Sequence, residues 1–438
     1  MQARTSISFL LIVATLVPSL AGAQIRGEIV DPGLARMPVA LPSLLAAGEP
    51  APQWADRFTK VLAGDLTTSG LFRVIDAAAY VDGGRDSGLE LATIDFADWD
   101  LVGAKGLVRG AYTTTPDGVE FEVRFFDVPG RRMMGGSKLK VAAGSLAEGV
   151  DRAAHRAADA LIQDLTGRRG PFDSRIAFVS DRGGHTREIY AFSFEGTIQR
   201  VTEHRSLTMA PSWSPNAAAL LFTSFRDGRP ALFSKDLVSG FETRRASKMG
   251  LNIGGAWSPD GSLLAVARET DGNTDLYTLD FVSGAERRRT THWGIDVDPA
   301  WSPDGRWLAF CSSRGGAPQV YVMRLSDGAV ERRTFEGSYN CAPAWSPDGQ
   351  WLAYAGRTGG RFQIFVMPSL GGVARQITFA GSNEDPTWSP DSRYVAYSSE
   401  RAGRRKIYLS DRTGRWERQL TDGSGDDTSP SWSGRPSQ

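Results

Sequence analysis

A tryptophan followed by serine recurs six times in the C-terminal part of the chain at nearly constant spacing. The tryptophans are Trp213, Trp257, Trp301, Trp345, Trp388 and Trp432, at intervals of 44, 44, 44, 43 and 44 residues. A fixed period of this length is the signature of a repeat architecture, in which each repeat is one supersecondary unit. This part of the chain is therefore not an ordinary domain built around one core.

Each interval shows the same succession of turns and strands. Three of the six tryptophans precede Ser-Pro-Asp-Gly, which favours a tight turn because proline presets φ and glycine tolerates a left-handed backbone. After Trp301, alternating runs at Trp307–Ser312, Gln319–Met323 and Val330–Thr334 predict three further strands. Four strands in about 44 residues make one propeller blade. We expect the tryptophans to pack between blades; the alternative is a set of aromatic platforms for sugars.

The ends of the repeat array indicate how the ring closes. Before the first tryptophan, Arg175–Val179, Glu188–Phe194 and Ile198–Thr202 match the second, third and fourth strands of a blade. Trp432 lies in a first strand with no blade after it. Joining the two partial units gives a sixth blade and leaves no open sheet edge. The sequence predicts an all-β six-bladed propeller, residues 174–438, closed by the C-terminal strand.

Residues 1–23 have the pattern of a secretory signal peptide. Arg4 supplies a positive charge, Ile7–Leu20 is apolar, and Ala21–Ala23 provides small residues for cleavage. The apolar run is short for a membrane span, so an uncleaved anchor is the weaker alternative. No later stretch is long and apolar enough to span a membrane, and we expect an exported protein without direct membrane insertion.

Residues 24–166 lack the repeat and predict a separate α/β domain with an N-terminal tail. A helical apolar face lies within Pro52–Gly70, and Leu107–Val128 has a hairpin pattern around Pro116-Asp117-Gly118. A last helix begins at Ser145, which with Glu148 forms a predicted capping box, and Gly167 ends it. Residues 167–173 form a polar linker.

Charge and motifs exclude several function classes. Fifty Lys and Arg balance fifty Asp and Glu, which is unlike the basic excess of nucleic-acid-binding proteins. The chain has no Gly-x-Ser-x-Gly elbow and no phosphate-binding loop, and its four histidines lack metal-ligand spacing. We therefore expect no catalytic residues, no metal and no cofactor.

Cys311 and Cys341 end the second strand of one predicted blade and begin the first strand of the next. Both positions fall at the same rim, so an exported protein could join them in a structural disulfide. Cys311 also occupies a position that holds small residues in the other repeats, such as Val179 and Ser398, where a buried thiol would fit equally well. The sequence leaves both interpretations open.

The connections from each fourth strand to the next first strand should converge at one mouth of the propeller channel. They contain pairs of acidic residues, and the loops between second and third strands on the same face are rich in arginine. The acidic residues are Asp296, Asp298, Glu384, Asp385, Asp426 and Asp427; the basic ones are Arg182, Arg187, Arg226, Arg229, Arg401, Arg404 and Arg405. An acidic mouth with a basic rim would suit a protein partner or a cation, while solvated loop charges are the plain alternative.

The order of signal peptide, small α/β domain and six Trp-Ser-Pro-Asp-Gly blades resembles the TolB family, the periplasmic component of the Tol-Pal system of Gram-negative bacteria. The resemblance covers nearly all of the chain after residue 23 and implies a propeller of WD40-like (PD40) repeats. It implies a non-catalytic, monomeric adaptor in the periplasm, whose mouth binds the lipoprotein Pal and whose N-terminal segment binds TolA. Such an adaptor supports outer-membrane integrity and the inward movement of that membrane during cell division.

Transferred to this sequence, the resemblance implies two sets of contact residues. The expected Pal-binding residues are Leu251, Gly254, Asp296, Val297, Asp298, Asn340, Glu384 and Asp385, and the expected TolA-binding residues are Gln24, Ile25, Arg26, Gly27, Glu28 and Ile29. Two other functions remain as alternatives: a propeller that gates or partners a hydrolase, and a periplasmic glycan-binding propeller.

Overall fold

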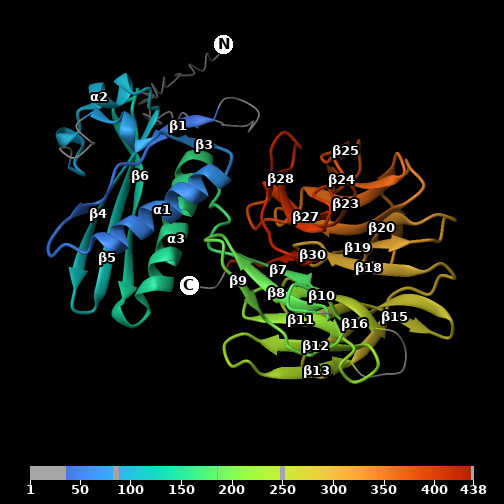
Figure 1. Cartoon of the computed structure of the whole chain (residues 1–438). Helices are drawn as coiled ribbons and strands as arrows, with labels where there is room; N and C mark the ends of the chain where they lie inside the picture. The colour runs from blue at the N-terminus through green and yellow to red at the C-terminus, as the bar shows by residue number, and fades with distance from the viewer. Residues whose placement is uncertain (1–35, 82–87, 185, 247–251, 436–438) are drawn as a thin grey trace, which may run out of the picture.

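The structure is a computed structural model that describes residues 36–81, 88–184, 186–246 and 252–435. The predicted signal peptide and the tail residues Gln24 to Ile29 lie outside this part of the chain, as does Leu251. Figure 1 shows two domains side by side, an N-terminal one in blue to teal and a propeller in green to red.

The N-terminal domain is a mixed sheet covered by two long helices. The sheet has the order β3-β1-β4-β5-β6, with β2 added beside β4. Its strands are β1 (Met37–Ala40), β2 (Leu45–Ala46), β3 (Phe72–Val74), β4 (Gly106–Thr115), β5 (Gly118–Asp127) and β6 (Arg132–Ala142); the helices are α1 (Pro52–Thr68), α2 (Phe96–Leu101) and α3 (Leu146–Thr166). The predicted hairpin is confirmed, because β4 and β5 pair from Gly106–Asp127 to Thr115–Gly118.

Apolar faces of α1 and α3 form the core of this domain with the sheet. Phe58 stacks on Phe121 of β5 at a centroid distance of 4.4 Å, and Val150 and Ile162 of α3 are fully buried in the same cluster. Gly167 ends α3 with a φ of 74°, as predicted. The capping box is wrong: Ser145 is the N-cap residue but makes no side-chain capping bond, because α3 continues directly from a 3₁₀ turn over Ala143–Ser145.

The second domain is a propeller of six four-stranded sheets, which confirms the predicted fold. The first three blades are β10 (Thr208–Trp213), β11 (Ala219–Ser224), β12 (Ala231–Asp236) and β13 (Glu242–Ala246); β14 (Asn252–Trp257), β15 (Leu263–Thr270), β16 (Asn273–Asp280) and β17 (Glu286–Arg288); and β18 (Asp296–Trp301), β19 (Trp307–Ser312), β20 (Gln319–Arg324) and β21 (Val330–Arg332). The next two are β22 (Asn340–Trp345), β23 (Trp351–Thr358), β24 (Arg361–Pro368) and β25 (Arg375–Gln376); and β26 (Asn383–Trp388), β27 (Tyr394–Ser399), β28 (Lys406–Asp411) and β29 (Glu417–Gln419). We number these blades one to five in chain order.

The sixth blade joins the two ends of the repeat array. Strand β30 (Asp427–Trp432) pairs antiparallel with β7 (Arg175–Ser180), which is followed by β8 (Glu188–Ser193) and β9 (Ile198–Arg200). The register runs from Asp427–Ser180 to Trp432–Ile176. Closure by the C-terminal strand is therefore confirmed.

The repeated tryptophans lie at blade interfaces. Trp213, Trp301, Trp388 and Trp432 belong to apolar clusters that span neighbouring blades. The indole N–H of Trp301 donates to the Ala256 carbonyl of the preceding inner strand at 3.0 Å, and Trp388 donates to Ala344 in the same way. This geometry supports packing as their role.

The turn after each tryptophan keeps its shape even where the glycine is missing. Gly261, Gly305 and Gly349 have φ between 69° and 74°, and Ala217 and Ser392 at the equivalent positions take φ of 56° and 62°. The surrounding blade holds these two residues in a backbone region that side chains disfavour.

The N-terminal domain packs on the face of the propeller that carries these turns, which we call the turn face. Arg168 pairs at 2.8 Å with Asp348, in the turn after Trp345, and the Tyr394 hydroxyl donates to the Ser69 carbonyl. His155 of α3 contacts Glu195, in the β8–β9 hairpin, at 3.1 Å. The opposite face, which holds the predicted mouth, is free of these contacts. In the described part of the chain, no helix combines the length and apolarity of a membrane span.

Candidate functional site

The channel is lined by the first strand of each blade, and each first strand contains a β-bulge at the same position. Successive first strands contact one another around the ring, and β10 contacts β30. The residue three before each tryptophan has a left-handed backbone and lies at a shift in the strand register. These six residues are Ala210, Gly254, Asp298, Ala342, Asp385 and Ser429, with φ between 49° and 70°. We call them the bulge ring.

Two members of the bulge ring are acidic. Asp298 is accessible to solvent, yet protein atoms surround its carboxyl group because it faces a narrow channel. This enclosure raises the pKa of Asp298 to about 6, and the Asp385 carboxylate adds to the shift. Burial also raises the pKa of Asp385, although a hydrogen bond from Ser429 opposes the change. The channel therefore holds two carboxyl groups that ionise with difficulty.

Glu384 and Tyr339 lie next to this acidic pair. Glu384 accepts a hydrogen bond of 2.9 Å from Arg405 in the β27–β28 loop, and burial raises its pKa in spite of that cation. Burial also raises the pKa of the Tyr339 hydroxyl, with further contributions from Asp298 and Glu384. Asp298, Glu384 and Asp385 thus form one acidic group at the mouth, with the Tyr339 hydroxyl close by.

Several sequence-predicted mouth residues instead support the blade from within. Asp296 has no exposed surface and pairs with Arg314 at 2.9 Å, and Asp427 is equally buried between Arg182 and Lys406. Asn340 is 3 % exposed and donates to the Gln319 side chain. Asp296 and Asp427 lie at the starts of strands, whereas the sequence predicted loops, and their carboxylates pair with cations inside the blades.

The other predicted positions are nearer to the surface. Gly254 belongs to the bulge ring, and Val297 is half-buried beside Asp298. Glu384 and Asp385 are also half-buried. The structure therefore brings Gly254, Val297, Asp298, Glu384 and Asp385 to the channel, whereas Asp296 and Asn340 lie beneath it.

Several arginines of the predicted basic rim form ion pairs with carboxylates of their own blades. Arg182 pairs with Asp427 at 2.6 Å, Arg401 pairs with Glu417 at 2.6 Å, and Arg226 pairs with Glu242. The Arg226 guanidinium also lies 4.0 Å from the ring centroid of Phe233, a cation–π contact. These loop arginines are structural. Arg187, Arg229 and Arg404 are exposed and make no ion pair within the described residues.

Sequence reasoning missed a group of exposed apolar side chains on the mouth face. Trp293, Ile295, Phe335 and Phe379 are between 54 % and 73 % exposed and lie in the loops that follow β17, β21 and β25. We call them the apolar arc. A signal was present for two of them: Thr334 and Thr378 turn their hydroxyls inward to accept from Val320 and Ile364, so the residue after each faces outward. Exposed apolar groups gathered on one face mark interaction surfaces.

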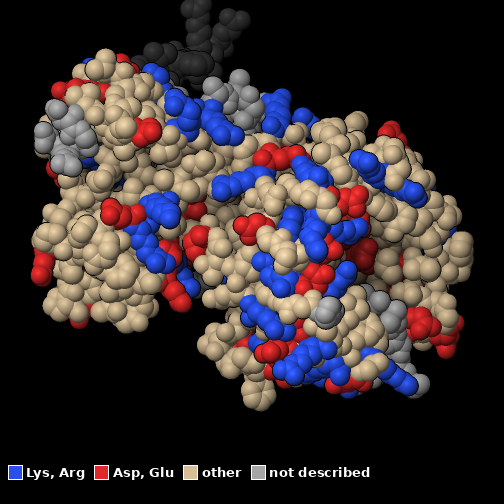
Figure 2. All heavy atoms as spheres, in the orientation of Figure 1, with Lys and Arg blue, Asp and Glu red and all other residues tan. Residues whose placement is uncertain are grey.

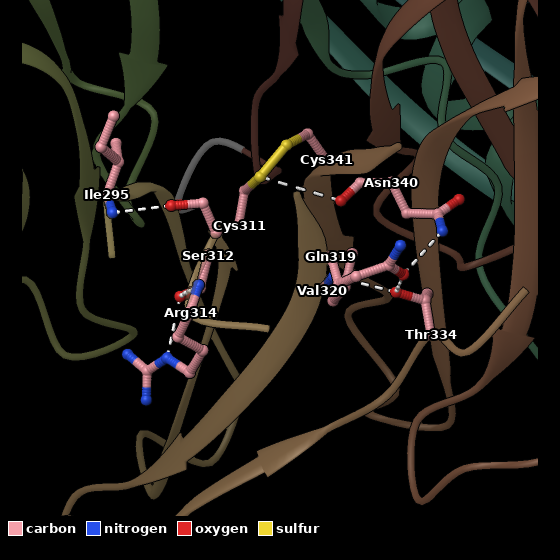
Figure 3. Close-up of a disulfide and its surroundings, with 10 residues drawn as sticks. Ile295, Cys311, Ser312, Arg314, Gln319, Val320, Thr334, Asn340 and Cys341 are labelled. Atoms are coloured by element: carbon pink, nitrogen blue, oxygen red, sulfur yellow. Dashed lines mark hydrogen bonds between the residues drawn. A yellow bond between two sulfur atoms is a disulfide. The ribbon is translucent and has the colours of Figure 1, made fainter. Parts of the chain in front are cut away.

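A disulfide joins two blades beside the bulge ring. The sulfurs of Cys311 in β19 and Cys341 in β22 are bonded, with a Cα–Cα distance of 4.9 Å (Figure 3). Cys341 directly precedes Ala342, whose amide N–H is hydrogen-bonded to the Asp298 carboxyl group. The bridge therefore fixes β22, the strand whose Ala342 N–H bonds to Asp298. This role is structural and not catalytic.

Within the described residues, no three or more His, Cys, Asp or Glu side chains are grouped to hold a metal ion. In the view of Figure 2, basic and acidic side chains are interspersed over the propeller without a large patch of one sign.

Comparison with known proteins identifies the family. The model of the TolB β-propeller domain (PD40) matches residues 162–435, and that of the TolB amino-terminal domain matches residues 25–134. The chain belongs to the TolB family.

Curated relatives and a solved structure agree with this assignment. The Tol-Pal system protein TolB of Syntrophotalea carbinolica is 40 % identical over 213 residues, and that of Ruegeria sp. is 32 % identical over 218. Each alignment covers 48 % of the relative, so the matched part spans about half the length of these curated TolB proteins. The crystal structure of TolB from Acinetobacter baumannii is 26 % identical with a TM-score of 0.80, covering 91 % of this chain and 97 % of that one.

Proposed function

We propose that this TolB-family chain is a non-catalytic adaptor of the Tol-Pal system that works in the periplasm as a monomer. Its propeller mouth binds the lipoprotein Pal, and its N-terminal segment, Gln24 to Ile29, binds TolA. By linking the two partners it supports outer-membrane integrity and the inward movement of the outer membrane during division.

The observation that carries this proposal is the composition of the mouth face. The apolar arc lies on three consecutive inter-blade loops, next to the acidic group of Asp298, Glu384 and Asp385. Protein interfaces combine an apolar centre with a charged surround that sets orientation and partner choice. The N-terminal domain packs on the turn face and so leaves this surface open to a partner as large as a folded domain.

The two halves of the proposal can be separated in one pull-down. The chain from residue 24 onward is tagged at its C-terminus and mixed with envelope extract, and Pal and TolA are detected by immunoblot. We expect deletion of residues 24–36 to remove TolA and leave Pal. Conversely, Phe335→Ser with Phe379→Ser should remove Pal and leave TolA, whereas Leu370→Ser, an exposed apolar residue on the turn face, should change neither. Retention of both partners by all variants would overturn the proposal.

A further inference from the structure

A cavity on the turn face takes no part in the binding of Pal and TolA proposed above. It has a volume of about 430 Å³ and lies between blades one and two. Trp257, Phe281 and Phe241 provide its apolar walls, and Arg245, Asp236 and Asp260 provide its charges. The described contacts of the N-terminal domain fall on blades four to six, for example at Asp348, Tyr394 and Glu195, so they leave this cavity uncovered.

The rim of the cavity is apolar and solvent-exposed. Phe241 lines it and is 76 % exposed, and Val238 in the same hairpin is 91 % exposed. Val282, in the β16–β17 hairpin directly after Phe281, is 93 % exposed. Large exposed apolar side chains next to a preformed hollow favour a protein or peptide ligand.

Among the described residues, Arg245 is the one cationic side chain that lines this cavity, and no described carboxylate pairs with it. Its Nε donates to the Ser234 hydroxyl at 2.7 Å, and its guanidinium lies 3.9 Å from the ring centroid of Phe281. Within the described residues, its terminal amino groups have no acceptor and no carboxylate is within 4.0 Å. Burial lowers the pKa of Arg245, which reflects the cost of enclosing this charge without a counter-ion.

The repeat supplies an internal comparison for this missing partner. Arg333 occupies the position of Arg245 in blade three, where it pairs at 2.8 Å with Glu331, two residues earlier. In blade one the residue two positions earlier is Thr243, which lines the cavity and carries no charge. Arg289 in blade two resembles Arg245: it donates to the Thr278 hydroxyl and has no ion pair within the described residues, so of the three arginines only Arg333 is paired within its own blade.

The two acidic residues of the lining restrict what else can bind. Asp236 accepts hydrogen bonds from the N–H groups of Val238 and Ser239, and Asp260 accepts from the Ser262 N–H and the Ser258 hydroxyl. These charges disfavour a multiply charged inorganic anion. They tolerate a ligand that presents N–H donors beside a single carboxylate, which is the composition of a peptide.

We propose that this cavity binds an extended peptide segment of a partner protein that presents a carboxylate beside a large apolar side chain. The carboxylate bonds to Arg245, and the apolar side chain packs against Phe241 and Trp257. This surface lies on the face opposite the mouth, so its occupancy goes beyond the adaptor function proposed above and does not depend on it.

The test compares two probes that differ only in charge: N-acetyl-Leu-Phe with a free C-terminal carboxylate, and the same dipeptide as its C-terminal amide. Binding is followed through the indole N–H signal of Trp257 in ¹H–¹⁵N spectra of the full chain, assigned with Trp257→Phe. We expect the carboxylate to bind about tenfold more tightly than the amide, since the ion pair with Arg245 is replaced by a hydrogen bond to an uncharged carbonyl.

Matched variants decide the origin of that preference. Thr243→Glu recreates the pair found in blade three at an exposed position, and it should abolish the preference. Arg245→Met should also abolish the preference, and Arg333→Met should have no effect. Equal affinities of the two probes for the wild-type chain would overturn the proposal, as would displacement of the peptide by an equal concentration of inorganic phosphate.

Discussion

The Asp385 carboxylate accepts a hydrogen bond of 3.0 Å from the hydroxyl of Ser429 in the next blade. Both residues belong to the bulge ring, Asp385 in β26 and Ser429 in the closing strand β30. A second contact, from the backbone N–H of Trp432 to the Thr387 hydroxyl at 3.1 Å, joins the same two strands. Strand β30 is therefore held on one edge by the ladder to β7 and on its other side by blade five.

This arrangement predicts that closure dominates propeller stability. Truncation before Ser429 removes the Asp385 contact, the Trp432 packing and two of the four residue pairs of the β30–β7 ladder, so we expect a large fall in the melting temperature by calorimetry. Removal of residues 436–438 alone is the control and should leave the melting temperature unchanged. If the truncated chain melted at the wild-type temperature, closure by β30 would not stabilise the ring.

The two aspartates of β18 should respond oppositely to neutralisation. Asp298 has a folded-state pKa of about 6, above its ordinary value, so its contribution to stability is present at pH 4 and is lost as the pH rises through 6. We expect Asp298→Asn to stabilise the chain at pH 7.5 by about 1 kcal/mol, a figure reduced for its solvent access, and to have no effect at pH 4.

Asp296→Asn provides the matched comparison for that experiment. It breaks the buried pair with Arg314 and should destabilise the chain at pH 7.5. Urea denaturation at both pH values measures the effects of the two substitutions. A stability loss for Asp298→Asn at pH 7.5 would contradict the enclosed-carboxyl account.

The disulfide predicts a redox-dependent stability. Cys311→Ala with Cys341→Ala should lower the free energy of unfolding by about 3 kcal/mol without reductant, a typical value for a native bridge. The same difference should nearly vanish when both proteins are measured in reductant. Alkylation followed by mass spectrometry is the direct check: iodoacetamide should modify neither cysteine of the wild-type chain until it is reduced.

His155 links the two domains through charge. Its Nδ1 lies 2.6 Å from Asp65 of α1 and its Nε2 lies 3.1 Å from Glu195 of the propeller. Burial alone would lower the pKa of His155, but these carboxylates outweigh it and raise the pKa to about 10. Because the folded-state pKa is raised, the stabilisation is complete below about pH 6.5 and is lost as the pH rises through 10.

Substitution of His155 tests this link. We expect His155→Gln to lower the free energy of unfolding by about 3 kcal/mol at pH 7, since the buried Asp65 and the partly exposed Glu195 lose their counter-charge. Arg57→Gln, which breaks a pair with Asp151 on the same two helices, should cost less than about 1 kcal/mol because Arg57 is partly exposed. Thermal scans of the wild type and both variants at pH 7 and pH 10 check this prediction. If His155 were neutral, the difference in melting temperature between the wild type and His155→Gln would be the same at both pH values.

The propeller could be predicted from the sequence because the residues that define each blade recur at a nearly fixed interval. Trp213 to Trp432 mark the first strand of each blade, and the partial units at Arg175 and Trp432 specify which strands must meet. The Ser145 capping box failed because the competing signal, a 3₁₀ turn formed by the residues before it, has no clear sequence pattern.

The side chains at the mouth could be predicted only in part from the sequence, and the β-bulge in β18 explains why. Asp296 and Asp298 are two residues apart and would share a face in a regular strand. The register shift between Val297 and Ala300 turns Asp298 toward the channel while Asp296 stays buried against Arg314. Asp298 precedes Pro299, a position that ordinarily favours extended backbone, so its φ of 53° runs against the local signal.

The central claim is that the mouth binds Pal, and calorimetric titration of the chain from residue 24 onward with the soluble domain of Pal tests it most directly. The account predicts saturable binding that Asp298→Arg, Glu384→Arg and the Phe335→Ser, Phe379→Ser pair each weaken at least about tenfold, as expected for central interface residues, while Leu370→Ser on the turn face binds as the wild type does. Wild-type affinity in all the mouth variants would contradict it.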